Sequence, residues 1–470
     1  MRAVRRVALV LALLSAFILP LGAVSAQGPL TYGSAFQLQN LEDSQAAITI
    51  TFYAQDGSEA ASVTDTIAAN SANNYFAVQV EGLPESFTGS AIVSSDREIR
   101  AIHNLYANDF TFNASSAGYN AGAPEISLPL VMRGNSNNNT WFNVQNAGSE
   151  DATVQVVYTA GLFGTDWTDP TTYTISPGAS MTFDQTGLTQ LGDRFVGSAT
   201  VRSTNDVPLV ASVVQVGPGV LYAYDGFTQN STDIVAPLFQ YYNAGNVSSI
   251  QIQNAGDTAT TVTVQYTPGF AGNACTETQT IDPGSAGTFG LFAFNAATAG
   301  SDCYANNPGT RFVGSASIQT NSADQPLVGV VNQLNLSQGL ASSYSAYRPA
   351  EAQSTISLPL LMDRNSGFWT SINLVNIGPA TTVTIDYVGR LDRGQGEVFT
   401  TSETFDIGEG EPVIRLHAPG GFEIADGWVG SATIRGANAS DQLLAVVNQV
   451  RTGGSGDVFQ TYNGFGFTAP

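Results

Sequence analysis

One pattern of roughly 110 residues recurs four times along this 470-residue chain, and that repetition constrains the fold more than any single residue. Its clearest marker is the tripeptide Gly-Ser-Ala, which begins at Gly89, Gly197, Gly314 and Gly430. Each copy of the tripeptide is followed by an apolar run, with starts at Arg97, Pro208, Pro326 and Gln442. A segment of this size can bury its own core, so the sequence predicts an array of small domains rather than one large fold.

The repeat divides the chain into a leader, 1–26, and four modules at 27–123, 124–233, 234–352 and 353–470. Leu-Pro-Leu at Leu128 and Leu358, with Ala-Pro-Leu at Ala236, opens three of the copies. Proline there suits an edge or first strand, where no ladder donor is needed. Because few residues separate the copies, the linkers are short, and we expect the modules to form a semi-stiff rod.

Within each copy, apolar and polar residues alternate as they do in strands with one buried face. Val262, Val264 and Tyr266 fall on one side of such a strand in the third copy. Turn signals such as Asn254-Ala255-Gly256 separate the strands, and no stretch has a convincing helical period. The sequence therefore predicts an all-β chain of four β-sandwiches with about seven strands each.

The Asn-x-Gly turn before a Val-x-Val-x-Tyr strand carries a resemblance. Asn254-Ala255-Gly256 is followed by Val262 to Tyr266, and copies two and four repeat the arrangement. In this the chain resembles bacterial extracellular immunoglobulin-like repeats, including cell-adhesion-related domains. The resemblance covers nearly the whole chain after the leader. The chain departs from true immunoglobulin domains in lacking their inter-sheet cysteine pair with a buried Trp. It implies tandem immunoglobulin-like β-sandwiches with a role in surface structure or adhesion.

The leader has the form of an export signal. Arg2, Arg5 and Arg6 precede an apolar run from Val7 to about Leu21, and small residues end the segment at Ala26. Arg5-Arg6 raises twin-arginine export, but the Leu-rich run favours the general secretory route. No later segment reaches the ~18 apolar residues that span a bilayer. We expect a secreted protein, extracellular or at the cell surface, without membrane insertion.

Charge limits the partners. All 16 basic residues are Arg, and three of them lie in the leader, which leaves 13 against 38 Asp and Glu. A surface this acidic repels nucleic acid and anionic lipid, so we expect no nucleic-acid partner. The absence of Lys also excludes Schiff-base chemistry and lysine isopeptide cross-links.

Cys275 and Cys303 are the only cysteines, and both lie in an insertion unique to the third copy. We expect them to form a structural disulfide, worth roughly 3–4 kcal/mol in the chain-entropy model. A redox or metal site is the alternative, but no Cys-x-x-Cys or clustered His supports it.

The usual catalytic motifs do not occur. His103 lies in the apolar strand of copy one, where we align it with Val214, Asn332 and Asn448, and His417 reads as a loop residue beside Pro419-Gly420-Gly421. Paired carboxylates could hydrolyse a glycosidic bond, but nothing singles out one pair. Acidic turns that could bind Ca²⁺ are Glu150-Asp151, Asp166 with Asp169, and Glu409 with Glu411. We read them as solvated turns and expect no cofactor, with Ca²⁺ as the alternative.

Aromatic residues unique to one copy are free to carry function. Trp167, between acids in a turn, and Tyr241-Tyr242 in a loop are the candidates for stacking on sugar rings. Trp428 replaces Phe195 and Phe312 before Val-Gly-Ser-Ala, which favours the core. The recurring Gln215, Gln333 and Gln449 are read as satisfying backbone groups at a strand end.

These observations favour a secreted, non-catalytic surface or extracellular-matrix repeat protein that acts as a structural spacer or adhesin. Its expected partners are other surface or matrix components, polysaccharide among them, or further copies of itself. A carbohydrate-binding array is the alternative, and a glycosidase is third.

Overall fold

The structure is a computed structural model that describes residues 30–108, 110–335, 337–451 and 456–467. In these residues strands are the dominant element, and they form eight antiparallel sheets. The sheets face each other in pairs around apolar cores, and we call these pairs modules 1 to 4 in chain order. The prediction of an all-β chain is confirmed, and no helix in the described ranges is long and apolar enough to cross a membrane.

The first two modules contain sixteen strands. Those of module 1 are β1 (Tyr32–Asn40), β2 (Ala46–Ala54), β3 (Glu59–Ile67), β4 (Ala72–Phe76), β5 (Gly89–Ser95), β6 (Ile99–Ala107) and β7 (Phe112–Ala117), with the 3-10 turn η1 (Ala77–Gln79). Those of module 2 are β8 (Glu125–Arg133), β9 (Asn139–Asn146), β10 (Ala152–Phe163), β11 (Trp167–Thr168), β12 (Tyr173–Ile175), β13 (Ser180–Asp184), β14 (Phe195–Ser203), β15 (Leu209–Gly217) and β16 (Val220–Asp225), with η2 (Thr189–Leu191).

The last two modules repeat the plan, and module 3 adds two short helices. Module 3 contains β17 (Asp233–Tyr241), β18 (Val247–Asn254), β19 (Thr260–Ala271), β20 (Cys275–Ile281), β21 (Ala286–Phe289), α2 (Leu291–Asn295), α3 (Cys303–Asn306), β22 (Phe312–Thr320), β23 (Leu327–Asn335) and β24 (Leu340–Ser345). After η3 (Pro349–Glu351), module 4 contains β25 (Thr355–Asp363), β26 (Phe368–Asn376), β27 (Thr381–Arg390), η4 (Asp392–Gly394), β28 (Val398–Ile407), β29 (Pro412–His417), β30 (Trp428–Gly436), β31 (Leu443–Arg451), β32 (Phe459–Asn463) and β33 (Phe465–Gly466). β17 begins one residue before the predicted third boundary.

Each module has an axial sheet and a companion sheet. In module 3 the axial sheet has the order β21-β18-β23-β24 and the companion sheet the order β17-β22-β19-β20. Modules 2 and 4 follow the same order, with small additions at the edges of their companion sheets. Module 1 has a complete axial sheet, β4-β1-β6-β7, but its companion sheet has only β3-β2-β5. Among the described residues, module 1 therefore has no counterpart of β8, β17 or β25.

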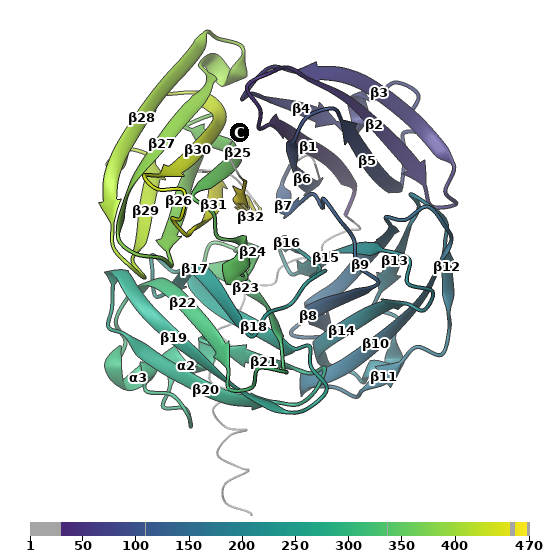
Figure 1. The fold of residues 1–470 in the computed structure, drawn as a ribbon. Helices are drawn as coiled ribbons and strands as arrows, with labels where there is room; N and C mark the ends of the chain where they lie inside the picture. Colours follow the sequence, from purple (N-terminus) through teal and green to yellow (C-terminus); the bar gives the residue numbers. More distant parts are fainter. Residues whose placement is uncertain (1–29, 109, 336, 452–455, 468–470) are drawn as a thin grey trace, which may run out of the picture.

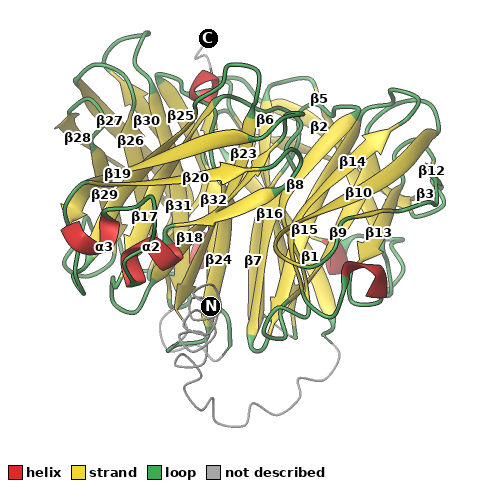
Figure 2. Cartoon of the chain, turned by 90° about the horizontal axis from the view of Figure 1, so that it is seen from below, coloured by secondary structure: helices red, strands yellow, loops and turns green. Residues whose placement is uncertain are grey.

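The modules close into a ring, so the prediction of a rod is wrong. The last strands of the four axial sheets, β7, β16, β24 and β32, meet at the centre (Figure 1), and they run along the ring axis (Figure 2). Module 1 also contacts module 4, since the Gln37 side-chain amide donates to the Pro359 carbonyl over 2.6 Å. Short linkers are compatible with a ring as well as with a rod. The contacts between sheet faces of different modules determine that the modules form a ring and not a rod.

Asp457 lies at one end of the central strands and joins all four modules. Its carboxylate accepts hydrogen bonds from the backbone N–H groups of Leu221, Ala341 and Phe459 over 3.0, 3.0 and 3.3 Å. Its backbone carbonyl accepts from the N–H of Asn113 over 3.0 Å. The four donors occupy the same register position on the four central strands. The side chain is completely buried, which raises the pKa of its carboxyl.

Gln215 and Gln333 form a polar layer in the middle of the ring. The Gln215 amide donates to Asn332 and Ser343 of module 3, and the Gln333 amide donates to Asn448 and Thr461 of module 4. Both glutamines are completely buried. They join neighbouring modules, whereas the sequence interpretation assigned them to backbone groups at a strand end.

Asp225 marks the other end of the central strands, at the position occupied by Ala117, Ser345 and Asn463 in the other modules. Both carboxylate oxygens accept from the Ala117 N–H, over 2.9 and 3.1 Å. Asn463 makes a two-way contact instead, because it accepts from the Ser345 N–H over 3.1 Å and donates to the Ser345 carbonyl over 2.7 Å. Burial raises the pKa of Asp225 to about 7.

Candidate functional site

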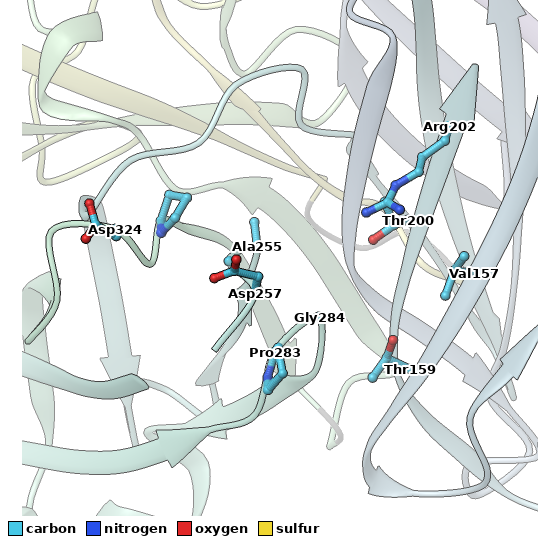
Figure 3. Close-up of a pocket in the computed structure, with 11 residues that line it drawn as sticks. Val157, Thr159, Thr200, Arg202, Ala255, Asp257, Pro283, Gly284 and Asp324 are labelled. Atoms are coloured by element: carbon cyan, nitrogen blue, oxygen red, sulfur yellow. The ribbon is translucent and has the colours of Figure 1, made fainter. Parts of the chain in front are cut away.

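An open groove lies between the companion sheet of module 2 and the turns of module 3 (Figure 3). Its volume is about 580 Å³. Thr159, Thr200 and Arg202 stand on one wall, and Asp257 and Asp324 on the other. The Arg202 guanidinium is paired with Glu125 at 2.6 Å. The groove therefore presents hydroxyl groups and charges of both signs, which suits a polar ligand held by hydrogen bonds.

The predicted stacking residues do not share one exposed face. Trp167 belongs to β11 of module 2 and stacks on Tyr158, with ring centroids 5.6 Å apart. Tyr241 ends β17 of module 3 and is 3% exposed, packed against Phe294. Its neighbour Tyr242 is 48% exposed. Of the three, Tyr242 is the one with a ring open to solvent.

Sequence reasoning missed the exposed aromatic residues of module 3. Phe292 on α2 and Tyr304 on α3 are 45% and 40% exposed, and Phe270 at the end of β19 is 68% exposed. The insertion that carries the cysteines was the available signal for Phe292 and Tyr304. Trp428, in contrast, is completely buried beside Tyr387, in keeping with the core position favoured by its place in the repeat.

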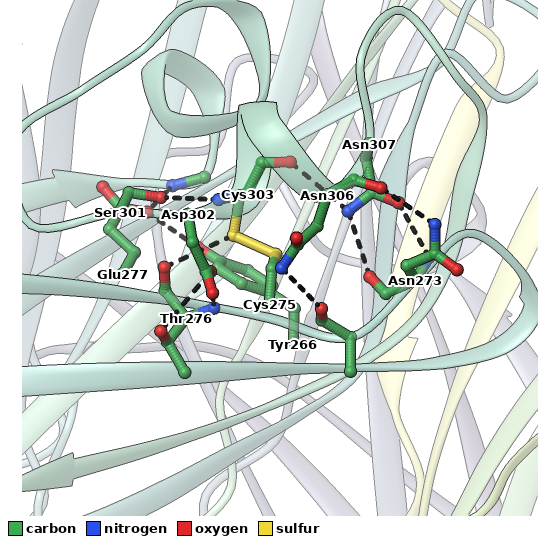
Figure 4. Close-up of a disulfide and its surroundings, with 12 residues drawn as sticks. Tyr266, Asn273, Cys275, Thr276, Glu277, Ser301, Asp302, Cys303, Asn306 and Asn307 are labelled. Atoms are coloured by element: carbon green, nitrogen blue, oxygen red, sulfur yellow. Dashed lines mark hydrogen bonds between the residues drawn. A yellow bond between two sulfur atoms is a disulfide. The ribbon is translucent and has the colours of Figure 1, made fainter.

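Cys275 and Cys303 form a disulfide that ties β20 to α3 (Figure 4). Hydrogen bonds on both sides hold the same connection: Asp302 accepts from the Thr276 N–H over 2.7 Å, and Asn307 accepts from the Asn273 N–H over 2.7 Å. The carboxylate of Asp302 lies near the two sulfurs. Because the sulfurs are bonded to each other, they are not thiolate ligands for a metal. The insertion is a stapled structural element.

A core tyrosine recurs at equivalent positions as Tyr158, Tyr266 and Tyr387, each opposite the alanine of Gly-Ser-Ala. A different buried polar group meets each hydroxyl: the Gln185 amide at 3.3 Å, Glu277 at 3.0 Å, and His417 Nε2 at 3.1 Å. Burial raises the pKa of Glu277. Glu277 and His417, the two ionisable side chains of this set, therefore satisfy core hydroxyl groups.

His417 ends β29 and is completely buried, so its interpretation as a loop residue was wrong. Its Nδ1 lies 3.0 Å from the Thr370 hydroxyl. In module 2 Gln185 bridges the equivalent pair, Thr140 and Tyr158. Loss of hydration lowers the pKa of His417 to about 4, which keeps the imidazole neutral at pH 7.

We expect His417→Gln to fold with a loss of less than about 1 kcal/mol, because glutamine already makes this bridge in module 2. His417→Ala should cost about 3 kcal/mol, because it opens a cavity and removes one hydrogen bond from each of two buried hydroxyls, which keep only their bonds to Met362 and Glu403. Urea unfolding of both variants checks this. Equal losses from the two substitutions would contradict the bridging role.

His103 points into module 1 between its sheets. It pairs with Phe36 as Val213 pairs with Phe142, so its counterparts are Val213, Val331 and Val447. The sequence alignment was wrong by one residue. His103 Nε2 lies 3.1 Å from the Ser34 hydroxyl, and loss of hydration lowers the pKa of His103 to about 4.

Three carboxylates of the acidic turns accept hydrogen bonds locally. Asp166 accepts from the Ala160 N–H over 2.7 Å, Asp169 from the Tyr173 hydroxyl over 2.7 Å, and Glu411 from the Gly408 N–H over 2.6 Å. These bonds close the turns. Solvated turns without a bound ion stay the prediction, and Ca²⁺ binding stays the alternative.

No protein-family model matches the chain, and a search of characterised proteins finds no match. Among solved structures, a glycoside hydrolase of family 32 from Bifidobacterium adolescentis aligns with 91% of this chain and 98% of its own. The identity is 10% and the TM-score 0.14, so this likeness carries no argument about fold or function.

Proposed function

We propose that this chain is a secreted, non-catalytic surface or extracellular-matrix protein whose four modules form one ring-shaped adhesive or structural unit. The main support is that the buried polar groups named above have structural hydrogen-bond partners within the ring. Asp457, Gln215 and Gln333 hold modules together, and Glu277 and His417 satisfy core tyrosines. The sequence analysis expected a rod-like spacer that holds two points apart. A closed ring is not elongated in that way, so the proposal is a compact structural or adhesive unit instead of a spacer.

Carbohydrate binding is the second candidate. The open groove offers threonine hydroxyls and charges of both signs, and module 3 exposes Tyr242, Phe292 and Tyr304 outside the groove, as a second candidate surface. Aromatic faces stack on the apolar faces of sugar rings, and polar groups around them fix orientation. This observation moves the candidate surface from Trp167 to module 3.

The test is binding of the purified chain from residue 27 to a panel of glycans and cell-wall polysaccharides, with and without Ca²⁺, beside light scattering. Concentration-dependent self-association without glycan binding supports the structural unit. Saturable glycan binding that is lost in Phe292→Ala or Tyr304→Ala, and kept in Trp167→Ala, favours the carbohydrate-binding candidate. A monomer that binds no glycan and no surface component contradicts both.

A further inference from the structure

Among the residues that the structure describes, the companion sheet of module 1 has one strand fewer than those of the other modules. In modules 2 to 4 the strand beside the Gly-Ser-Ala strand carries a proline and at least seven buried residues, as with Ile126, Leu128 and Leu130 around Pro129 in β8. In module 1, β5 pairs with β2 on one edge, and no described strand pairs with its other edge. A free edge leaves a row of backbone N–H and C=O groups open to another strand.

The side chains beneath that edge are uncovered. Val93 and Phe36 are half-buried, although their counterparts in the other modules are completely buried. Ala91 is exposed, whereas its counterparts Ala199, Ala316 and Ala432 are at most 2% exposed. An uncovered apolar strip therefore runs along β5, at the place where the other modules hold their own first strand, and we call it the β5 groove.

Module 2, which faces the uncovered strip of module 1, also differs from its counterparts in the other modules. Around the ring, equivalent residues of the axial sheets enter the core of the preceding module: Val330 enters module 2, Val446 module 3 and Ile102 module 4. The fourth equivalent is Ser212 of module 2, a half-buried polar residue that faces the incomplete module 1. Asn143 beside it is also half-buried, while its counterparts Gln37, Gln251 and Asn373 are buried.

The lining of the groove differs in one respect. In modules 2 to 4 a tyrosine hydroxyl on the central strand bonds the first strand, as Tyr224 bonds both the N–H and the carbonyl of Leu130. Module 1 has Ser116 at this position, opposite His103. The tyrosine ring is missing, and the His103 imidazole and the buried Ser116 hydroxyl stand at its place, so an incoming strand meets polar groups there.

Once the leader is removed, too few residues precede β1 to form the first strand of module 1. A further Leu-Pro-Leu, at Leu19–Leu21, lies inside the export signal. Cleavage after Ala26 leaves residues 27–31 before β1, whereas β8 has nine residues and residues 134–138 connect it to β9. Five residues cannot supply both a nine-residue strand and its turn.

We propose that module 1 of the exported protein accepts a β-strand from another polypeptide, an extended segment with alternating aliphatic side chains around a proline. Strand addition of this kind takes its affinity from main-chain hydrogen bonds and its specificity from pockets for alternate side chains. It extends the proposed surface role by naming how a partner attaches. The test of this proposal measures the binding of a peptide strand. The test of the proposed function measures glycan binding and self-association, so the two can fail independently.

The probe is a fluorescein-labelled peptide with the β8 sequence, Glu125–Arg133, and a second peptide with Leu130→Tyr to bring a hydroxyl to the polar groups at Ser116. The control peptide carries Leu128→Asp. We expect the first two to bind the purified chain and to slow amide hydrogen exchange in β5, with the tyrosine peptide tighter and the aspartate peptide at least about 10-fold weaker.

Protein variants supply the matched control. Ala91→Glu places a charge in the groove at an exposed position, so the module should fold, and binding should weaken at least about 10-fold. Ser94→Glu places the same charge on the outer face of β5 and should change binding less than about 2-fold. Circular dichroism confirms that both variants are folded.

Three results would overturn the proposal. One is an exported protein whose intact mass includes residues 17–26 and whose β5 amides are already protected, because its own leader then fills the groove. Another is freely exchanging β5 amides with no peptide binding at about 1 mM, weaker than about 4 kcal/mol. The third is binding that neither Leu128→Asp nor Ala91→Glu reduces.

Discussion

Asp457→Ala is expected to lower the free energy of unfolding by about 4 kcal/mol, one of the two largest effects we predict. Three buried backbone N–H groups lose their acceptor, and each unsatisfied donor costs about 1–3 kcal/mol. Relief from burying a carboxyl offsets part of that cost. Because the donors belong to modules 2, 3 and 4, urea unfolding should also become less cooperative.

Asp457→Asn is the conservative partner of this experiment. Asparagine keeps one acceptor oxygen but turns an N–H group toward a backbone N–H, so we expect a loss of about 2 kcal/mol. Glu409→Ala removes an exposed carboxylate of module 4 and serves as the control. If Asp457→Ala unfolds within about 0.5 kcal/mol of that control, the central strands do not depend on Asp457.

Asp225→Asn is expected to stabilise the protein at pH 8 by about 2 kcal/mol and to have little effect at pH 4. The pKa of Asp225 is raised by burial from its ordinary value of 3.8 to about 7. Between these values the folded state binds more protons than the unfolded state, so this group's contribution to stability is lost as pH rises. The full shift corresponds to about 4 kcal/mol, which we halve because the side chain is not fully enclosed.

The structure already contains the arrangement that this substitution would make. Asn463 occupies the equivalent position in module 4 and bonds both the N–H and the carbonyl of Ser345. The amide side chain introduced by Asp225→Asn would keep the bond from the Ala117 N–H and could add one to the Ala117 carbonyl.

The measurement is the difference in unfolding free energy between the variant and the unchanged protein from pH 4 to pH 8. His103 and His417 have lowered pKa values, so their contribution is lost as pH falls below about 6.5. Both proteins contain these histidines, and their effect cancels in the difference. A difference that is constant across the range would contradict the raised pKa of Asp225.

Several features could be predicted because their signals are local. Alternation of apolar and polar residues is a property of a strand with one buried face, and Val262, Val264 and Tyr266 lie in the core of module 3 as their spacing requires. Cys275 and Cys303, the only cysteines in one insertion, could find only each other. Trp428 occupies a repeat position that other copies fill with phenylalanine.

Interpretation failed where the partner of a residue lies in another module. Gln215 and Gln333 look like polar residues at strand ends, and their partners are more than 100 positions away. His417 looks like a loop residue because glycines follow it, but a core tyrosine and a threonine surround it. The stacking candidate Tyr241 looks like a loop aromatic and instead packs inside module 3.

The sequence by itself determined the all-β character, the disulfide and the positions of most core residues, because each follows from short-range periodicity or from a choice with one outcome. The tertiary structure alone decided that the modules close into a ring, that Asp457 and Asp225 stand at the two ends of its central strands, and that no strand among the described residues takes the first position of module 1. Those features depend on contacts between sheet faces hundreds of residues apart, such as Gln37 with Pro359, and no local pattern encodes which faces meet.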